Sequence, residues 1–235
     1  MRVHQETENI WELRRLNLVN CFLVREADGF TLVDTNLPGS AARILDVVKN
    51  LSAPIRRIIL THAHFDHVGS LDELRGAIPD AEVYIGEREA RLMAGDLRLE
   101  PGENGKGLNG FLRTETKPTK FLRAGERFGS LEPVPCPGHT PGQFALQDMR
   151  DGTLLAADAF VNHLGLTAAG AFKVHFPLAA LFCWNKVQAA KSALALRKRE
   201  PTRLLFGHGD GMASPLARMD AAVEFALRQC GKMLD

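Results

Sequence analysis

Three histidines and an aspartate that could hold metal ions stand in one short run of the chain, Thr61-His62-Ala63-His64-Phe65-Asp66-His67. Neutral imidazole binds zinc, iron and nickel, and a carboxylate oxygen adds a harder ligand. A mixture of the two without thiolate favours zinc or a similar divalent ion. The alternative is a polar loop whose histidines are only solvated. Because ligands rarely coincide at this density, we predict a metal site.

The spacing within the run indicates two ions rather than one. His62 and His64 alternate as strand residues do, so both can chelate the same ion. Asp66 and His67 come where the chain turns towards a helix, and they have to point elsewhere. A second ion is the natural partner for this second pair.

A short buried strand must position these ligands. Residues 56–60 end in the apolar run Ile58-Ile59-Leu60, which is typical of a buried strand. A strand that ends at an edge of a sheet delivers the following loop to a fixed place. We therefore expect the histidine run to begin where this strand ends.

The elements around this strand occur nearly twice in the chain. Residues 21–34 read as a strand, an Asp-Gly turn, a second strand and an aspartate, which is Asp34. Residues 144–158 read in the same way and end on Asp158. The chain therefore contains two similar hairpins, each followed by a carboxylate.

The resemblance between the two copies continues beyond the hairpins. A helix is expected after each aspartate, with Ser40 as its N-cap in the first copy and over about residues 178–197 in the second. Each helix is followed by a proline, a strand and a histidine, His62 or His208. We predict an α/β fold of two sheets packed face to face with helices outside. It forms one domain over residues 1–235 with an internal pseudo-two-fold.

The second copy also supplies further ligands. His139 lies in a tight turn whose prolines and glycines suit a rigidly aimed side chain, Pro137-Gly138-His139-Thr140-Pro141-Gly142. Asp158 ends a strand and can bridge two ions with its two oxygens, and His208 can join Asp66 and His67. Each of these would be an ordinary loop residue if taken singly. Their placement at strand ends makes us predict that they are ligands.

Composition excludes several classes of partner. The 235 residues carry 29 basic and 28 acidic side chains, with the basic clusters scattered, so we expect no nucleic-acid partner. The first residues lack the apolar core of a signal peptide, and no run approaches the roughly 18 apolar residues that span a bilayer. We expect a cytoplasmic protein with no membrane partner.

The four cysteines stand far apart in the sequence, so we interpret them as reduced residues that pack in the core.

Together these motifs resemble the metallo-β-lactamase superfamily over about residues 18–210: the HxHxDH run, the PGHTPG turn, Asp158, the GHG around His208 and the Val33-Asp34-Thr35 step. The resemblance implies a four-layer αββα sandwich with a dinuclear centre. It implies one ion on His62, His64 and His139, another on Asp66, His67 and His208, and Asp158 between them. It also implies that Asp34 supports the ligand loop without touching metal.

Details within the superfamily narrow the activity. Its β-lactam-cleaving members generally have cysteine or serine where Asp158 stands and are usually exported, which argues against that activity. Glyoxalase II has a long C-terminal helical segment, whereas here about 25 residues, one helix, follow Asp210. The closer resemblance is to lactonases and glyoxalase-like hydrolases, including quorum-quenching lactonases. Those lactonases place a tyrosine near the metals, but the only tyrosine here, Tyr84, lies in an expected strand over residues 82–85.

The predicted activity is hydrolysis of a small-molecule lactone, ester or thioester. A hydroxide that bridges two ions, zinc first with iron, manganese or cobalt as alternatives, would attack the carbonyl. Asp158 holds the ions, and Asp66 assists departure of the leaving group. The alternatives are a mononuclear iron enzyme that resembles the persulfide dioxygenases and a thioesterase that resembles glyoxalase II. A nuclease is disfavoured because no basic arm is evident. The superfamily often dimerises, so a homodimer is an open expectation.

Two segments are expected to select the substrate. The glycine-rich residues 95–119 carry Phe111 and read either as a flap beside the metals or as an insertion loop. Residues 160–176 predict an apolar pocket for an acyl chain, against ordinary core packing, through Phe160, Leu164, Phe172, His175 and Phe176. His163 or His175 could replace the missing tyrosine as a donor to the oxyanion. The alternative is that both are ordinary surface or core histidines.

Overall fold

The computed structural model describes residues 1–173 and 177–231, and it divides the chain into two compact units. Unit 1 comprises Met1–Leu97 and Gly110–Arg123, and unit 2 comprises Arg98–Asn109 and Ala124–Asp235. The prediction of a single domain over residues 1–235 stays a prediction.

Unit 1 is built on a seven-stranded sheet whose described strands are paired in chain order. The first four strands pair antiparallel, and the last four, beginning with β4, pair parallel. The strands are β1 (Arg2–Gln5), β2 (Ile10–Arg15), β3 (Val19–Glu26), β4 (Gly29–Val33), β5 (Ile55–Ile59), β6 (Glu82–Gly86) and β7 (Lys120–Leu122). The predicted strand before the histidine run is therefore confirmed as β5.

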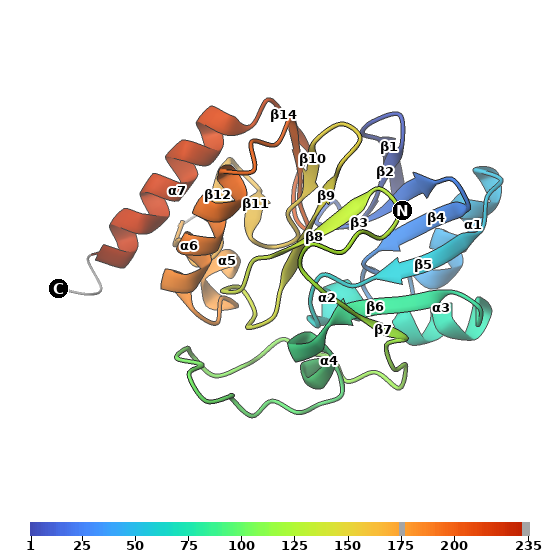
Figure 1. Ribbon diagram of the computed structural model, residues 1–235, viewed down its shortest axis with the longest axis horizontal. Coiled ribbons are helices and arrows are strands. Elements are labelled where there is room, and N and C mark those ends of the chain that lie inside the picture. The colour runs from blue at the N-terminus through green and yellow to red at the C-terminus, as the bar shows by residue number, and fades with distance from the viewer. Residues whose placement is uncertain (174–176, 232–235) are drawn as a thin grey trace. The chain divides into compact units, whose positions relative to one another are not determined.

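Helices connect the parallel strands of unit 1, because a parallel pair needs a crossover. These are α1 (Ala41–Asn50), α2 (Phe65–Val68), α3 (Leu71–Ala77) and α4 (Glu87–Met93). Ile44 and Val48 of α1 are buried, and α1 packs against α3 beside the sheet (Figure 1). Ser40 is the N-cap of α1 as predicted, but its hydroxyl accepts a hydrogen bond from Arg15 and makes no capping bond.

The parallel register brings several strand ends of unit 1 to one edge of its sheet. Val33 at the end of β4 pairs with Ile59 of β5, and Ile59 pairs with Tyr84 of β6. The residues that follow these strands therefore emerge side by side. Asp34 follows β4, the histidine run follows β5, and α4 follows β6.

Unit 2 contains a five-stranded sheet and a two-stranded sheet among its described residues. The larger sheet has the order β14-β13-β10-β9-β8, and the smaller one pairs β11 with β12. The strands are β8 (Leu131–Pro135), β9 (Phe144–Asp148), β10 (Thr153–Leu155), β11 (Phe160–Asn162), β12 (Leu166–Ala168), β13 (Arg203–Leu205) and β14 (Met212–Ala213).

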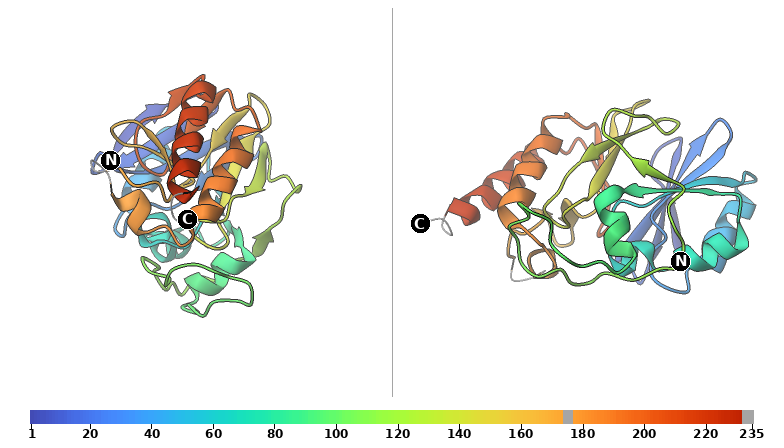
Figure 2. Two further views of the ribbon diagram at one scale, coloured as in Figure 1. Left: turned by 90° about the vertical axis from the view of Figure 1, so that its left-hand side faces the viewer. Right: turned by 60° about the horizontal axis from the view of Figure 1, so that its bottom comes forward.

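The helices of unit 2 are α5 (Leu178–Leu181), α6 (Lys186–Arg197) and α7 (Leu216–Gly231). The predicted C-terminal helix is confirmed as α7, which begins directly after Pro215 and lies side by side with α6 (Figure 2). Small side chains such as Ala190, Ala193 and Ala222 are buried in the core of this unit. No helix in the described part of the chain is both long and apolar enough to cross a membrane.

Each unit contains the repeat that the sequence predicts. In unit 1, β3 and β4 form an antiparallel hairpin and β5 then pairs parallel with β4. In unit 2, β9 and β10 form the hairpin and β13 pairs parallel with β10. The hairpin, helix and strand are therefore present in both copies.

The helix predicted over residues 178–197 is wrong in its extent. The structure breaks it into α5 and α6, with residues 182–185 between them. The backbone N–H groups of Trp184 and Asn185 are bonded to carbonyls of the turn that carries His139, so they cannot serve a continuous helix. Asn185 instead caps α6, since its side chain accepts a hydrogen bond from the N–H of Gln188.

Candidate functional site

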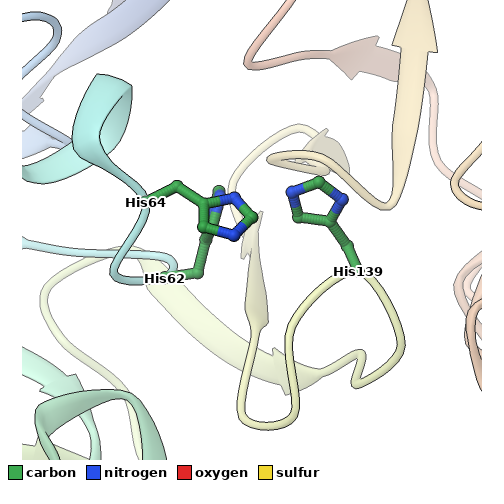
Figure 3. A group of neighbouring side chains, drawn as sticks. All are labelled: His62, His64 and His139. Carbon is green, nitrogen blue, oxygen red and sulfur yellow. The ribbon is translucent and has the colours of Figure 1, made fainter. Parts of the chain in front are cut away.

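The histidines of unit 1 are gathered at the end of β5. The side chains of His62, His64 and His67 are buried, with exposed fractions of 0%, 4% and 0%. The ring centroid of His62 lies 4.8 Å from that of His64 and 3.9 Å from that of His67. Figure 3 shows the first two rings next to one another, on the loop that follows β5. Asp66, in α2, is half-buried.

Asp34 anchors this cluster through hydrogen bonds to both ends of the histidine run. Its Oδ2 atom lies 2.8 Å from Nδ1 of His67, and the same oxygen accepts a hydrogen bond from the Thr61 hydroxyl at 2.8 Å. Its Oδ1 atom accepts the backbone N–H of Thr61 at 2.8 Å. Asp34 has a φ of +60°, a left-handed conformation that turns the chain sharply at the end of β4. Asp34 thus ties Thr61 and His67 together by hydrogen bonds, and its role in supporting a metal site stays a prediction.

These bonds indicate which ring nitrogen of His62 and of His67 carries the proton. A carboxylate only accepts, so His67 donates from Nδ1 and keeps a lone pair on Nε2. The Thr61 hydroxyl donates its single proton to Asp34. It can therefore only accept a hydrogen bond from Nδ1 of His62, which lies 3.0 Å away. His62 therefore also keeps its lone pair on Nε2. Both rings are held in the tautomer that a metal ligand needs.

Two further segments of unit 1 hold the same loop. The carboxylate of Glu89, in α4, accepts the backbone N–H of Ala63 at 2.9 Å. On the other side, the N–H of Phe65 donates to Gly110, and the Phe111 ring lies 4.7 Å from that of His64. Phe111 therefore lies beside the His64 ring within unit 1, and its part in a substrate pocket stays a prediction.

His139 of unit 2 lies in the turn between β8 and β9, drawn in Figure 3, and its side chain is 4% exposed. The backbone carbonyl of His139 accepts the N–H of Trp184 at 2.9 Å, and that of Gly138 accepts the N–H of Asn185 at 2.8 Å. The Ser192 hydroxyl of α6 donates to Pro137 at 2.6 Å. This turn is therefore clamped against the start of α6, which explains how a loop can aim its histidine.

Asp158 and His208 come from equivalent positions after two parallel strands. Leu155 pairs with Leu205, and each candidate ligand lies three residues beyond its strand's paired residue. Nε2 of His208 lies 3.2 Å from Oδ2 of Asp158. Nε2 of His139 lies 3.4 Å from the same oxygen. The three predicted ligands of unit 2 therefore converge, with the carboxylate between the two imidazoles.

The residues predicted to form a substrate pocket differ in their burial. Phe160 is fully buried in the hydrophobic core of unit 2, which corresponds to the core-packing alternative. Leu164 and Phe172 are exposed, and His163 is half-buried in the turn between β11 and β12. His175 and Phe176 lie outside the described residues. Tyr84 is buried in β6, where its hydroxyl bonds to Glu82.

Sequence reasoning did not identify Thr61 and Glu89 as part of this site. Thr61 directly precedes the first histidine, so its place in the sequence could have indicated a role at the site. Nothing in the sequence indicated such a role for Glu89, because a glutamate in the first turn of a short helix normally faces solvent. It lies 26 residues from Ala63 in the chain, and only the parallel pairing of β5 with β6 brings the two together.

Comparison of the sequence with known families gives a match over most of the chain. The sequence model of a family described as "Metallo-beta-lactamase superfamily" matches residues 14–208. A relative in Bacillus subtilis, "Uncharacterized protein YobT", is 43% identical over 231 residues, 96% of this chain and 99% of the relative. "Probable metallo-hydrolase YflN" of the same organism is 29% identical over 87% of this chain and 86% of its own length.

Solved structures are similar over the whole chain. The subclass B3 metallo-beta-lactamase BJP-1 of Bradyrhizobium japonicum has a TM-score of 0.69 at 19% identity, covering 100% of this chain and 94% of that chain. At this identity the likeness shows the fold alone. The predicted α/β metallo-β-lactamase fold is thereby confirmed.

Proposed function

The chain belongs to the metallo-β-lactamase superfamily of metal-dependent hydrolases, and from this premise we propose that it hydrolyses small-molecule lactones, with esters and thioesters as related substrates, at a centre of two zinc ions. Superfamily membership supports the metal-dependent hydrolysis. The donor chemistry of the two units supports the dinuclear centre. The lactone is the substrate class expected from the sequence.

The proposed ligands come from both units. In this proposal His62, His64 and His139 would hold one ion, Asp66, His67 and His208 would hold the other, and the Asp158 carboxylate would serve both. The residues fit zinc because they offer imidazole nitrogen and carboxylate oxygen, which are preferred ligands of this ion. Neither unit alone contributes all seven side chains.

The observation that carries the proposal is the hydrogen-bond chain from Asp34. It holds Nδ1 of His67 directly and Nδ1 of His62 through the Thr61 hydroxyl. A cluster of solvated histidines would need no such arrangement. Buried imidazoles whose proton is held on Nδ1 present the lone pair of Nε2 to a metal ion.

When bound, the ions supply an activated water and polarise the substrate carbonyl. The chain's own residues keep the reacting groups in position. Oδ2 of Asp158 lies 3.4 Å from Nε2 of His139 and 3.2 Å from Nε2 of His208, so these three donor groups of unit 2 face one another. Asp66 is half-buried in α2, where its carboxyl can exchange a proton with the leaving group. Phe111 forms an apolar surface against His64.

A turnover screen tests the proposal. The zinc-loaded protein is assayed against acyl lactones, acyl thioesters and a persulfide, and its metal content is measured by mass spectrometry. We expect two zinc ions per chain and the highest kcat/KM on a lactone. Replacement Asp158→Ala should lower kcat/KM by at least about a hundredfold, since it removes a ligand shared by both ions.

The matched control is Asp220→Ala, which removes a largely exposed carboxylate of α7 from the same unit. It should leave turnover unchanged. A single iron per chain with persulfide oxidation would overturn the proposal in favour of a mononuclear oxygenase. Thioester cleavage without lactone cleavage would reject the substrate class but keep the hydrolase.

A further inference from the structure

We propose that Glu89 is a positioning residue for the metal-bearing loop: its buried carboxylate holds the peptide group that joins His62 to Ala63 and so sets the direction of the His62 and His64 imidazoles. The inference rests on the proposed metal site and adds a residue to it.

The burial of Glu89 is the first observation. Its side chain belongs to the first turn of α4, yet it has an exposed fraction of 0%. Glutamate is almost never fully buried unless it is paired, because burial removes the hydration of its charge. Glu87, two residues earlier in the same helix, is exposed. The first turn of α4 therefore carries two carboxylates, of which only Glu89 points into the protein.

The target of the Glu89 carboxylate is the second observation. Oε2 accepts the backbone N–H of Ala63 at 2.9 Å, and Ala63 is itself fully buried. That N–H belongs to the peptide group that joins His62 to Ala63. A hydrogen bond to a charged acceptor is stronger than a neutral one. The bond therefore limits rotation of this peptide, and with it the direction of the flanking side chains.

The surroundings of Ala63 give the third observation. The Ala63 carbonyl accepts the N–H of Leu112 at 3.3 Å. Two residues further along, the N–H of Phe65 donates to the carbonyl of Gly110 at 2.9 Å. The loop is thus held on one side by backbone and on the other by the Glu89 side chain. Asp34 anchors the ends of the run at Thr61 and His67, whereas Glu89 acts at its middle.

The first experiment uses zinc-free protein and does not depend on metal binding. In Glu89→Met, which keeps the side-chain length but loses the carboxylate, the Ala63 amide proton should move upfield and exchange faster with solvent. In Glu89→Gln the side-chain carbonyl can still accept, so protection should be retained. Equal protection in all three proteins would overturn the inference.

The second experiment measures zinc affinity by chelator competition and the absorption spectrum of cobalt-loaded protein. We expect Glu89→Met to weaken zinc binding by about 10- to 100-fold and to alter the cobalt spectrum, as loss of a group that orients ligands does. Glu89→Gln should restore most of the affinity, and the control Glu87→Ala should leave it unchanged. A merely structural role would lower the melting temperature of Glu89→Met without changing affinity or spectrum.

The outcomes separate the two proposals. Absence of zinc binding by the unaltered protein would refute the proposed function, and the role of Glu89 with it. Tight zinc binding by both the unaltered protein and Glu89→Met would refute the role of Glu89 alone. If Glu89→Met does not fold, Glu89→Asp takes its place: its carboxylate is one methylene shorter, so the bond to the Ala63 N–H should lengthen and zinc affinity should fall in the same direction.

Discussion

Thr61 shows how one hydroxyl can decide the state of a neighbouring imidazole. It donates to Asp34 and therefore accepts from Nδ1 of His62, so the tautomer of His62 depends on a residue that would not itself bind metal. Asp34 does the same for His67 without an intermediary. At the scale of single residues, we therefore expect metal binding to depend on these two hydrogen-bonded groups as well as on the proposed ligands.

Replacing Thr61 by valine tests this role. Valine keeps the shape of threonine but has no hydroxyl, so Nδ1 of His62 loses its acceptor while the backbone bond from residue 61 to Asp34 remains. We expect zinc affinity to fall by about 10- to 100-fold in a chelator-competition assay. Thr61→Ser, which keeps the hydroxyl, should bind zinc as the unaltered protein does. Equal affinity in both variants would show that the hydroxyl does not orient His62.

The four cysteines provide a second prediction at this scale. All four are buried and form no disulfide bond, and burial raises the pKa of Cys183 to about 12 and that of Cys21 well above its usual range. The thiolate is the reactive form, and a raised pKa keeps both of these groups protonated as the pH rises to 8. We expect Ellman's reagent to label no thiol of the native protein at pH 8 and four after unfolding in guanidinium chloride. Rapid labelling of the native protein would contradict their packing role.

At the scale of elements, the turn that carries His139 depends on close backbone approach to α6. Gly138 has a φ of +140°, and a Cβ atom there would lie 2.2 Å from the backbone nitrogen of Ala189. No side chain fits at this position without moving the helix or the turn. The glycine therefore allows the clamp by residues 184 and 185 that aims His139.

Gly138→Ala should accordingly destabilise the protein by about 2–3 kcal/mol or more, because it combines an unfavourable φ with overpacking. Thermal unfolding measures the effect, and zinc affinity should fall as well because the histidine turn is displaced. The control is Gly76→Ala in α3, where a Cβ meets no atom within 4 Å. It should be neutral or stabilise by up to about 1 kcal/mol through helix propensity. A neutral Gly138→Ala would mean that the clamp is not tight.

At the scale of the whole molecule, the proposed ligands divide between the two units, so metal binding is expected to couple them. Unit 1 offers three buried imidazoles on one loop, and unit 2 offers two imidazoles on either side of one carboxylate. A ligand that binds only the folded state stabilises it, by about 2.7 kcal/mol at a hundredfold excess over its Kd. If one metal centre uses the ligands of both units, removing the ligands of either unit should remove most of this stabilisation of the folded state.

Zinc titration of chelator-stripped protein should therefore raise the melting temperature by roughly 5–10 °C. His62→Ala in unit 1 and His139→Ala in unit 2 should each abolish most of this rise, and the double variant should lose little more. The control His4→Ala removes a largely exposed histidine and should keep the full rise. Additive, independent losses would indicate two separate metal sites in place of one shared centre.

Local patterns in the sequence were enough to predict the candidate ligands, both hairpins, the strand before the histidine run and the C-terminal helix. These features follow from short-range patterns: alternation in strands, Asp-Gly turns, and a proline before a helix. The resemblance in motifs also led to the correct fold class. Such signals lie within about ten to twenty residues of chain, so they can be interpreted without knowing what packs against them.

The contacts that hold the candidate ligands became visible only in the folded chain. Glu89 reaches Ala63 across 26 residues, Asp34 reaches Thr61 across 27, and the bonds from residues 184 and 185 to the His139 turn break the helix predicted over 178–197. Phe160 likewise lies in the core because of the elements around it. The physical reason is the same in each case. A hydrogen bond or packing contact between distant residues depends on the register of the strands that bring them together, and no local pattern records that register.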